Sequence, residues 1–212
     1  MTRWALGLRA WLTEVEVGQV LGLARKRAGR LGRRGGESGH VTLLAVRLGL
    51  ECGLRASELC GLRVGGVTVD EGVEATVHVG NGKCGSNGAV MMPAGLAGHV
   101  RGYLSAYRAG AGPGERLLRG RGRESLHRLR LAKRMKKLLA DALGLERSRE
   151  LAPCHCLRHT CAVLAYKATR DLVLVQKHLR HQSVKVTQIY ADVCSQERRA
   201  GIEKAFGGLS LS

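Results

Sequence analysis

The sequence predicts a mainly α-helical fold that carries a small antiparallel β-sheet. Apolar residues recur at helical spacing along most of the chain, and one stretch at residues 73–92 alternates between apolar and polar residues as a strand pair does. Hydrophobic residues make up 44% of the 212 residues and aromatic residues only 3%. The core must therefore consist mainly of Leu, Val and Ala, and one compact domain with at most a small appendage is expected.

The first helix is predicted to begin at Thr13. Thr13 and Glu16 have the spacing of a capping box, in which each side chain accepts a hydrogen bond from the backbone N–H of the other residue. Leu12 is placed to act as the hydrophobic staple of the same motif. A basic, glycine-rich loop is expected to follow over residues 30–39.

A second helix, over residues 40–50, is strongly apolar and is expected to end at Gly53. Arg55 then lies at the head of a short helix, and Glu58 follows one turn later, close enough for its carboxylate to orient the Arg55 guanidinium. Taken alone, this pair would be interpreted as a surface salt bridge.

The predicted sheet comes next. Residues 73–79 alternate as a half-buried strand, residues 80–82 form a turn signal, and residues 89–92 form a return strand that Pro93 ends. The connecting loop is rich in glycine, and Lys83 at its base could swing toward a phosphate. Without other evidence Lys83 would be interpreted as an ordinary hairpin lysine.

The remaining predicted helices cover residues 95–107, 124–143, 157–168, 171–179 and 184–191. Beyond the last of them, Ile202, Phe206 and Leu209 recur at three- to four-residue spacing. In a monomer this apolar stripe would fold back on its own core. The alternative is docking on a neighbouring protomer, head to tail.

The formal net charge of +18 predicts a polyanionic partner, because like charges on a compact body repel one another. Nucleic acid is the leading candidate, ahead of a membrane surface or a heparin-like polymer. Residues 116–149 hold 12 Lys and Arg against three acidic residues, and residues 25–34 hold six more bases. A solvated face does not need so many cations, so we expect phosphate contacts. The expected DNA-binding residues are Arg128, Arg130, Lys133, Arg134, Lys136 and Lys137.

Composition also suggests the compartment. No run of 18 apolar residues occurs, so no membrane-spanning helix is predicted. Arg3 and Arg9 interrupt any early apolar core, so no signal peptide is expected. The seven cysteines lack regular spacing, which favours reduced thiols in a cytoplasmic protein over a disulfide framework.

Zinc-type ligands gather at one place, namely Cys154, His155, Cys156, His159 and Cys161. Structural zinc sites usually use ligand pairs that a longer loop separates. A C-x-C pair that enters a helix gives poor geometry for four ligands, so no metal site is predicted. Cys161 is interpreted as a small core residue.

The candidate catalytic residues lie between Cys154 and Val193. His155 and Arg158 are three residues apart and share a helix face. His181 follows Arg158 by 23 residues, and Tyr190 follows His181 by nine. Together these side chains supply a nucleophile, a cation for an anionic substrate, and proton carriers or donors.

This stretch resembles the second active-site box of the tyrosine recombinases, the phage-integrase family. The matching segments are His155-Cys-Leu-Arg158-His159-Thr160, Leu179-Arg180-His181 and Thr187-Gln188-Ile189-Tyr190. The segment Gly53-Leu54-Arg55-Ala56-Ser57-Glu58-Leu59 is similar to the first arginine box of that family, and Gly82-Lys83 lies where the family keeps its hairpin lysine. The resemblance runs from about Leu12 to Val193 and implies the catalytic-domain fold of the family.

The resemblance implies that Tyr190 attacks a DNA phosphodiester and forms a 3′-phosphotyrosyl link. Arg55 and Arg158 would clamp the nonbridging oxygens through bidentate hydrogen bonds. A free phenol has a pKa near 10 and is a poor nucleophile at pH 7, and the nearby cations are expected to favour the phenolate.

Three further roles follow from the same resemblance. His181, with His155, would donate a hydrogen bond or carry the proton of the nucleophile. Lys83 would protonate the departing 5′-hydroxyl. No cofactor, metal or ATP is expected, because the protein–DNA link conserves the energy of the phosphodiester bond.

The chain departs from the family pattern at several positions. Arg180 stands where the family has glycine, and if that position needs a left-handed backbone an arginine costs about 1 kcal/mol or more. Thr169 replaces another glycine expected between helices, and Gly88 and Ala89 occupy a region that usually holds a basic residue. Few residues precede Thr13, so we expect the chain to lack the N-terminal core-binding domain of the family, as a short family member, an excised catalytic domain or a truncated gene product.

These observations predict an N-terminal extension over residues 1–11, a tyrosine recombinase catalytic domain over residues 12–194, and a C-terminal tail over residues 195–212 that docks on a neighbour. The implied function is site-specific recombination or integration of double-stranded DNA by a homo-oligomer, a tetramer on the DNA synapse. Two alternatives stay open. One is a DNA-binding regulator that kept the fold but lost turnover, and the other is a type IB topoisomerase that relaxes strands without exchanging them.

Overall fold

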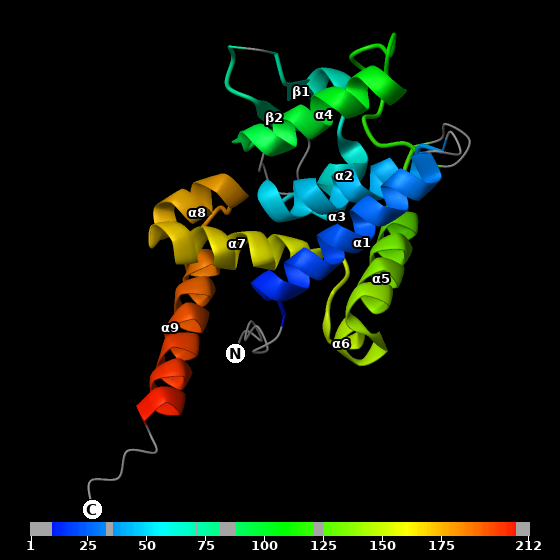
Figure 1. The fold of residues 1–212 in the computed structure, drawn as a ribbon. Helices are drawn as coiled ribbons and strands as arrows, with labels where there is room; N and C mark the ends of the chain where they lie inside the picture. Colours follow the sequence, from blue (N-terminus) through cyan, green and yellow to red (C-terminus); the bar gives the residue numbers. More distant parts are fainter. Residues whose placement is uncertain (1–9, 33–35, 71, 81–87, 121–124, 207–212) are drawn as a thin grey trace, which may run out of the picture.

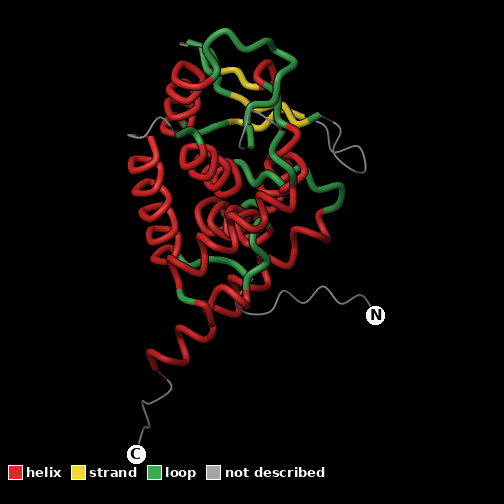
Figure 2. The backbone as a smooth tube through the Cα atoms, turned by 90° about the vertical axis from the view of Figure 1, so that its right-hand side faces the viewer, coloured by secondary structure: helices red, strands yellow, loops and turns green. Residues whose placement is uncertain are grey.

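The computed structural model describes residues 10–32, 36–70, 72–80, 88–120 and 125–206. The described elements are, in chain order, α1 (Glu14–Gly32), α2 (Ser38–Glu51), α3 (Ala56–Gly61), the 3-10 turn η1 (Val64–Gly66), β1 (Val67–Thr68), β2 (Thr76–Val79), β3 (Gly88–Met91), α4 (Ala94–Tyr107), α5 (Arg128–Leu143), α6 (Leu145–Glu150), α7 (His155–Thr169), α8 (Leu172–Leu179) and α9 (Val184–Phe206). The fold is mainly helical, with a small antiparallel sheet at one end of the helical body (Figure 1 and Figure 2). The predicted fold class is confirmed.

The first two helices pack closely. α1 begins with the predicted capping box, since Glu16 Oε2 accepts a hydrogen bond from Thr13 N (2.7 Å) and Thr13 Oγ1 accepts one from Glu16 N (3.2 Å). Ala24 and Ala28 bring small buried side chains to the face that meets α2. A Cβ atom at Gly39 would lie 2.8 Å from Ala28 Cα, so a larger residue there would push the helices apart.

The sheet has β2 at its centre, with β1 and β3 paired antiparallel on either side. Val77 lies opposite Val90, and both side chains are buried, as the alternation predicts. The first predicted strand begins at Thr76 instead of residue 73, because Val73 N donates to Asp70 O in a turn before the ladder starts. β1 was not predicted, since two residues are too few to show alternation.

Two hydrophobic cores meet along α7. Leu157 belongs to the main core, which α1, α2, α4, α5 and the sheet share, whereas Cys161 belongs to a second core with α8 and α9. The interpretation of Cys161 as a small core residue is confirmed. Trp11 and Tyr190 are buried in the same second core. Arg158 lies on α7 between the two cores and is itself buried.

Three helices differ from their prediction. α5 begins at Arg128, where His127 Nδ1 accepts a hydrogen bond from Leu129 N (3.3 Å), and residue 124 lies outside the described residues. α6 was not predicted because it is short and polar. α9 was expected to end at residue 191 but continues to Phe206, since residues 191–200 contain neither glycine nor proline. Its last turns extend away from the body (Figure 1).

The helices of the described segments are each too short or too polar to cross a membrane.

Candidate active site

Arg55 stands at the N-terminus of α3, where Glu58 holds it. Glu58 Oε2 accepts a hydrogen bond from Arg55 N (2.7 Å), and Glu58 Oε1 accepts one from Arg55 Nη1 (2.8 Å). The Glu58 side chain is 2% exposed and the Arg55 side chain is 34% exposed. A buried carboxylate therefore supports a guanidinium that a substrate can reach, and the predicted orienting contact is confirmed.

Arg158 ties two turns of the backbone together. Its Nη1 donates to Gly53 O, and its Nη2 donates to Leu179 O (2.5 Å). Gly53 ends α2 as predicted, with a φ of 61°, and a Cβ atom there would collide with Leu179 Cδ2. Burial and the neighbouring Arg55 lower the pKa of Arg158 to about 10, so the guanidinium stays protonated at pH 7. Arg158 thus brings the turn before Arg55 next to the turn before His181.

The turn that carries His181 closes α8 with a left-handed residue. His181 N donates to Gln176 O (3.0 Å), and Arg180 adopts φ 55° and ψ 45°. Arg180 thus has the left-handed backbone that was considered as a condition, at a cost of about 1 kcal/mol or more. Thr169, the other expected glycine replacement, is helical, and the left-handed residue there is the next one, Arg170 (φ 57°).

His181 is fixed by a hydroxyl from α9. Its Nδ1 lies 3.0 Å from Oγ1 of the buried Thr187, so Nε2 is the ring nitrogen that a substrate can meet. The His181 and Tyr190 rings are nearly parallel, 16° apart, with centroids 6.4 Å apart. Burial, with the charge of Arg158 next in size, lowers the pKa of His181 to about 4, so the ring is neutral at pH 7. The role of Thr187 was not predicted, although it lies three residues before Tyr190.

Tyr190 is buried, with 2% of its surface exposed. Burial raises the pKa of its phenol to about 12, although Arg158 and Arg55 act in the opposite direction. Arg158 and Arg55 do favour the phenolate, as expected, but burial outweighs both charges, so the phenol stays protonated at pH 7. Burial costs the phenolate more solvation free energy than the attraction of the two guanidiniums offsets.

The partner of the phenol is His159, which sequence reasoning did not select. His159 Nδ1 lies 3.0 Å from Tyr190 Oη. Burial, followed by the charges of His155 and Arg158, lowers the pKa of His159 to about 4, so the ring is a neutral acceptor. Its position one helical turn after His155 is the signal that could have identified it.

His155 lies exposed at the start of α7. Its ring centroid is 6.3 Å from that of His159. Partial burial lowers the pKa of His155, and Arg158 and Arg55 lower it further. His155 is therefore close to the arginines but not in the phenol contact. Lys83 lies outside the described residues, and its role stays a prediction.

Most of the predicted DNA-binding residues lie exposed along α5. The exposed ones are Arg128, Arg130, Lys133, Lys136 and Lys137. Arg134 is only half-exposed, and its Nη1 is buried without a partner among the described residues. Burial lowers the pKa of Arg134, and the nearby Arg130 lowers it further. Arg134 is thus less accessible to a phosphate than its neighbours.

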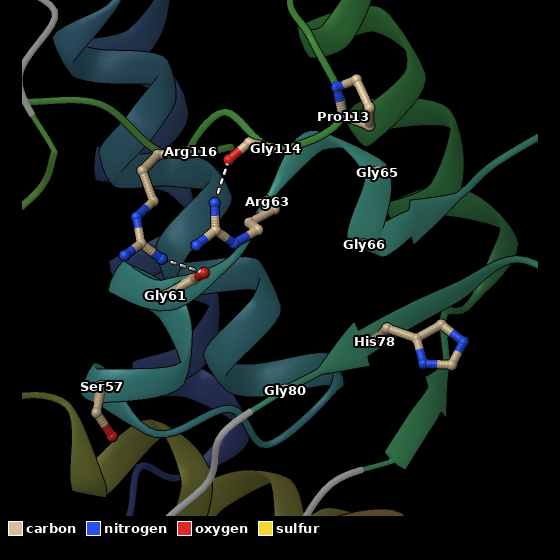
Figure 3. Close-up of a pocket in the computed structure, with 10 residues that line it drawn as sticks. All are labelled: Ser57, Gly61, Arg63, Gly65, Gly66, His78, Gly80, Pro113, Gly114 and Arg116. Atoms are coloured by element: carbon tan, nitrogen blue, oxygen red, sulfur yellow. Dashed lines mark hydrogen bonds between the residues drawn. The ribbon is translucent and has the colours of Figure 1, made fainter.

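A basic cleft of about 660 Å³ beside α3 was not predicted (Figure 3). It lies between α3, η1, the end of β2 and the loop at residues 113–116. Arg63 Nη1 donates to Gly114 O, and Arg116 Nη1 donates to Gly61 O (2.5 Å), so both guanidiniums are anchored on the backbone of the wall. The cleft joins segments far apart in the chain, and no local sequence signal marks it.

No group of three His, Cys, Asp or Glu side chains is placed to hold a metal ion within the described part of the chain. Cys154 and Cys156 carry free thiols. Burial raises the pKa of Cys154 to about 11 and that of Cys156 to about 12. Both thiols are therefore protonated at neutral pH.

The family model for the phage integrase family matches residues 11–197, and the chain belongs to this family. Tyrosine recombinase XerA of Thermococcus kodakarensis is 32% identical over 165 residues, which cover 76% of this chain and 54% of the relative. Tyrosine recombinase XerC of Neisseria gonorrhoeae is 34% identical over 138 residues, which cover 65% of this chain and 42% of the relative. The chain spans about half the length of the curated relatives it matches.

Solved structures show the same fold. The site-specific recombinase XerH, in a post-cleavage complex with a palindromic difH substrate, superposes with a TM-score of 0.73 at 23% identity. That match covers 93% of this chain and 53% of the XerH chain. A lambda integrase dimer bound to a COC′ core site gives a TM-score of 0.62 at 17% identity, covering 89% of this chain and 49% of that one.

Proposed function

We propose that this chain is the catalytic part of a site-specific DNA recombinase that cleaves and rejoins DNA through Tyr190. The observation that carries the proposal is the pair of hydrogen bonds from Arg158 to Gly53 O and Leu179 O. They bring Arg55 and His181 to the same end of α7, next to the helix that bears Tyr190. Membership of the phage integrase family supports the same function.

The proposed step transfers a phosphoryl group from the 5′-oxygen of the DNA to Tyr190 Oη. Tyr190 Oη bonds to phosphorus, the bond from phosphorus to the 5′-oxygen breaks, and the 5′-oxygen leaves with the electron pair and takes up a proton. The phenol must lose its own proton, and the neutral Nδ1 of His159 lies 3.0 Å away to accept it. The 5′-hydroxyl of another strand reverses the step, so no external energy is needed.

Five other side chains complete the proposed site. Arg55 and Arg158 stabilise the charge that develops on the nonbridging oxygens. His181 adds a hydrogen bond from Nε2. Lys83, by resemblance, gives a proton to the 5′-oxygen. His155 lies at the edge of the site, where it can assist a proton transfer.

Double-stranded DNA is the proposed partner, and its contacts extend over two basic surfaces that flank α3. Burial raises the pKa of the Cys60 thiol on α3, while the nearby Arg116 of the cleft and Arg128 of α5 lower it. Arg116 of the cleft and Arg128 at the start of α5 therefore both lie near α3, the helix that begins at Arg55. A duplex that crosses α3 would meet cations from both elements.

The assembly on DNA is also a proposal. We place a homo-tetramer on the synapse in the cytoplasm, with residues 12–194 as the catalytic domain, residues 1–11 as an extension and residues 195–212 as a tail that docks on a neighbour. Ile202 on the last turns of α9 is 56% exposed, which leaves an apolar side chain for such a contact. The Phe206 side chain and Leu209 lie outside the described residues.

The decisive test is covalent trapping on nicked duplexes that lose a short strand after cleavage. The wild-type chain should form an adduct that survives denaturation, and Tyr190→Phe should form none while it still binds DNA. Tyr166→Phe, on the same second core, is the matched control and should form the adduct. An adduct that persists in Tyr190→Phe would show another nucleophile.

The same assay separates the alternatives. DNA binding with no wild-type adduct on a pool of nicked sequences would point to a regulator that has lost turnover. Relaxation of supercoiled DNA without strand exchange would point to a type IB topoisomerase.

A further inference from the structure

Arg180 occupies a position at which its backbone is strained. It is the left-handed residue that ends α8, with φ 55° and ψ 45°, a conformation that glycine adopts without steric cost. The side chain is nonetheless directed into the protein and is only 6% exposed. Because this arginine is both strained in its backbone and buried in its side chain, we expect its guanidinium to have a role other than ending the helix.

The guanidinium of Arg180 ends at the carboxylate that supports Arg55. Arg180 Nη2 donates to Glu58 Oε2 (2.9 Å), the same oxygen that accepts the hydrogen bond from Arg55 N. Nη1 makes a longer contact with His178 O (3.4 Å), and Nε is buried without a partner among the described residues. The Arg180 side chain passes Gly88, and a Cβ atom on Gly88 would lie 3.6 Å from Arg180 Cδ.

The charges in this cluster do not cancel. Arg55 and Glu58 alone would form a neutral pair, which attracts a phosphate weakly. Arg180 adds a second cation to the same carboxylate, so the three side chains carry a net charge of +1. Burial alone would raise the pKa of Glu58, but the hydrogen bond from Arg55 N and the charge of Arg180 outweigh it and lower that pKa, so the carboxylate is ionised at neutral pH.

We propose that Arg180 is a positioning residue that neutralises Glu58 and so leaves the Arg55 guanidinium with an uncompensated charge for the scissile phosphate. The proposal rests on the proposed function. A phosphodiester brings one negative charge, and its transition state brings more. With Arg158 included, the site offers a net +2 from three arginines and one glutamate, so it favours the transition state over the ground state.

The experiment removes charge from the protein and from the substrate in turn. Single-turnover adduct formation is measured for wild type and Arg180→Gly on a normal nicked duplex, and on one with a methylphosphonate at the scissile position. The methylphosphonate replaces a charged nonbridging oxygen by a methyl group and makes the linkage neutral. We expect Arg180→Gly to lose roughly ten- to a hundredfold in rate on the phosphodiester, and to be close to wild type on the methylphosphonate.

Two further variants separate charge from structure. Arg180→Gly with Glu58→Gln restores the net charge and should recover a large part of the lost rate. Arg180→Lys keeps the charge and should retain most of the rate, which keeps the test valid if the glycine variant unfolds. Arg170→Gly is the matched control, because it relieves the other left-handed arginine (φ 57°) on the exposed end of α7.

Each outcome decides the proposal. An equal loss of rate on both substrates would show that Arg180 only holds the turn, and an unchanged rate in Arg180→Gly would show that it has no part in the step. If the wild-type chain forms no adduct at all, the proposed function fails first and this role falls with it. If the wild-type chain forms the adduct and Arg180→Gly forms it at the same rate, only this inference is overturned and the proposed function stands.

Discussion

The phenol oxygen of Tyr190 lies 3.0 Å from Nδ1 of His159, across the contact between α9 and α7. Burial moves the two pKa values apart, to about 12 for Tyr190 and about 4 for His159. A neutral phenol therefore faces a neutral imidazole at pH 7. For Tyr190 to donate to Nδ1, the ring proton of His159 must be on Nε2.

This pair gives the first prediction. His159→Phe keeps an aromatic ring beside Tyr190 but removes the proton acceptor, so adduct formation at pH 7 should slow by roughly a hundredfold. The loss should shrink as pH rises toward 10, because hydroxide can then take the phenol proton. His40→Phe, near the start of α2 with its ring tilted 42° against that of Tyr107, is the control. An unchanged rate in His159→Phe would remove His159 from the step.

The second prediction concerns stability and pH. His99, His159 and His181 each have a pKa lowered to about 4, with burial as the main cause. Since the unfolded histidines titrate near 6.5, the unfolded state binds more protons as pH falls from 6.5 to 4, and the free energy of unfolding must fall over that range. We expect a loss on the order of a few kcal/mol between pH 7 and pH 4.5, measured by urea denaturation. His159→Phe should show a smaller loss, and equal stability at both pH values would contradict the argument.

The third prediction is that Arg158→Lys is not conservative. A lysine keeps the charge but cannot reach both Gly53 O and Leu179 O, so one buried carbonyl loses its donor at a cost of about 1–3 kcal/mol. Cleavage should be lost almost completely while the protein stays folded. Arg101→Lys, which also gives up a guanidinium contact to a backbone carbonyl, is the control. Near-normal cleavage in Arg158→Lys would mean that the planar guanidinium is not needed.

The fourth prediction concerns the affinity for DNA. Binding should weaken steeply with salt, and each phosphate contact removed should reduce the slope of log affinity against log salt by about 0.9. Lys136→Gln on α5 should show this change. Lys177→Gln removes the same charge from the exposed face of α8, outside both basic stretches, and is the control. A flat salt dependence between about 50 and 200 mM would contradict an electrostatic interface.

The fifth prediction concerns assembly. Phe206→Ala should impair synapsis or strand exchange more than it impairs DNA binding by one protomer, because a buried aromatic anchor dominates such contacts. Glu203→Ala changes an exposed polar residue on the same turns and is the control. Size measurement on DNA decides the matter, since identical assemblies with and without Phe206 would remove docking between protomers.

The fold could be predicted from the sequence where signals are local. The capping box of Thr13 and Glu16, the glycine that ends α2 and the alternation of the sheet each lie within a few residues. The glycine that the family has at position 180 raised the left-handed backbone only as a condition, which the structure meets. The length of α9 could not be predicted, because good helix formers after Tyr190 give no stop signal.

The residues of the candidate site were easier to predict than the contacts between them. The spacing from His155 could have identified His159 as a member of the site, but its hydrogen bond to Tyr190 joins two helices and has no local signal in the sequence. The raised pKa of Tyr190 depends on burial, which outweighs the charges that the sequence does show. The cleft with Arg63 and Arg116 needs segments some 50 residues apart to fold against each other.

Trp11 shares a core with the nucleophile. It is 5% exposed in the cluster that holds Tyr190, its carbonyl accepts a hydrogen bond from Arg147 Nη2 (2.7 Å), and the next residue donates to Thr160 Oγ1 (2.8 Å). The backbone is thus fastened at the point where it enters the domain. A load applied upstream of residue 10, by a fused protein or a tether, would therefore pull on the hydrophobic core that holds Tyr190.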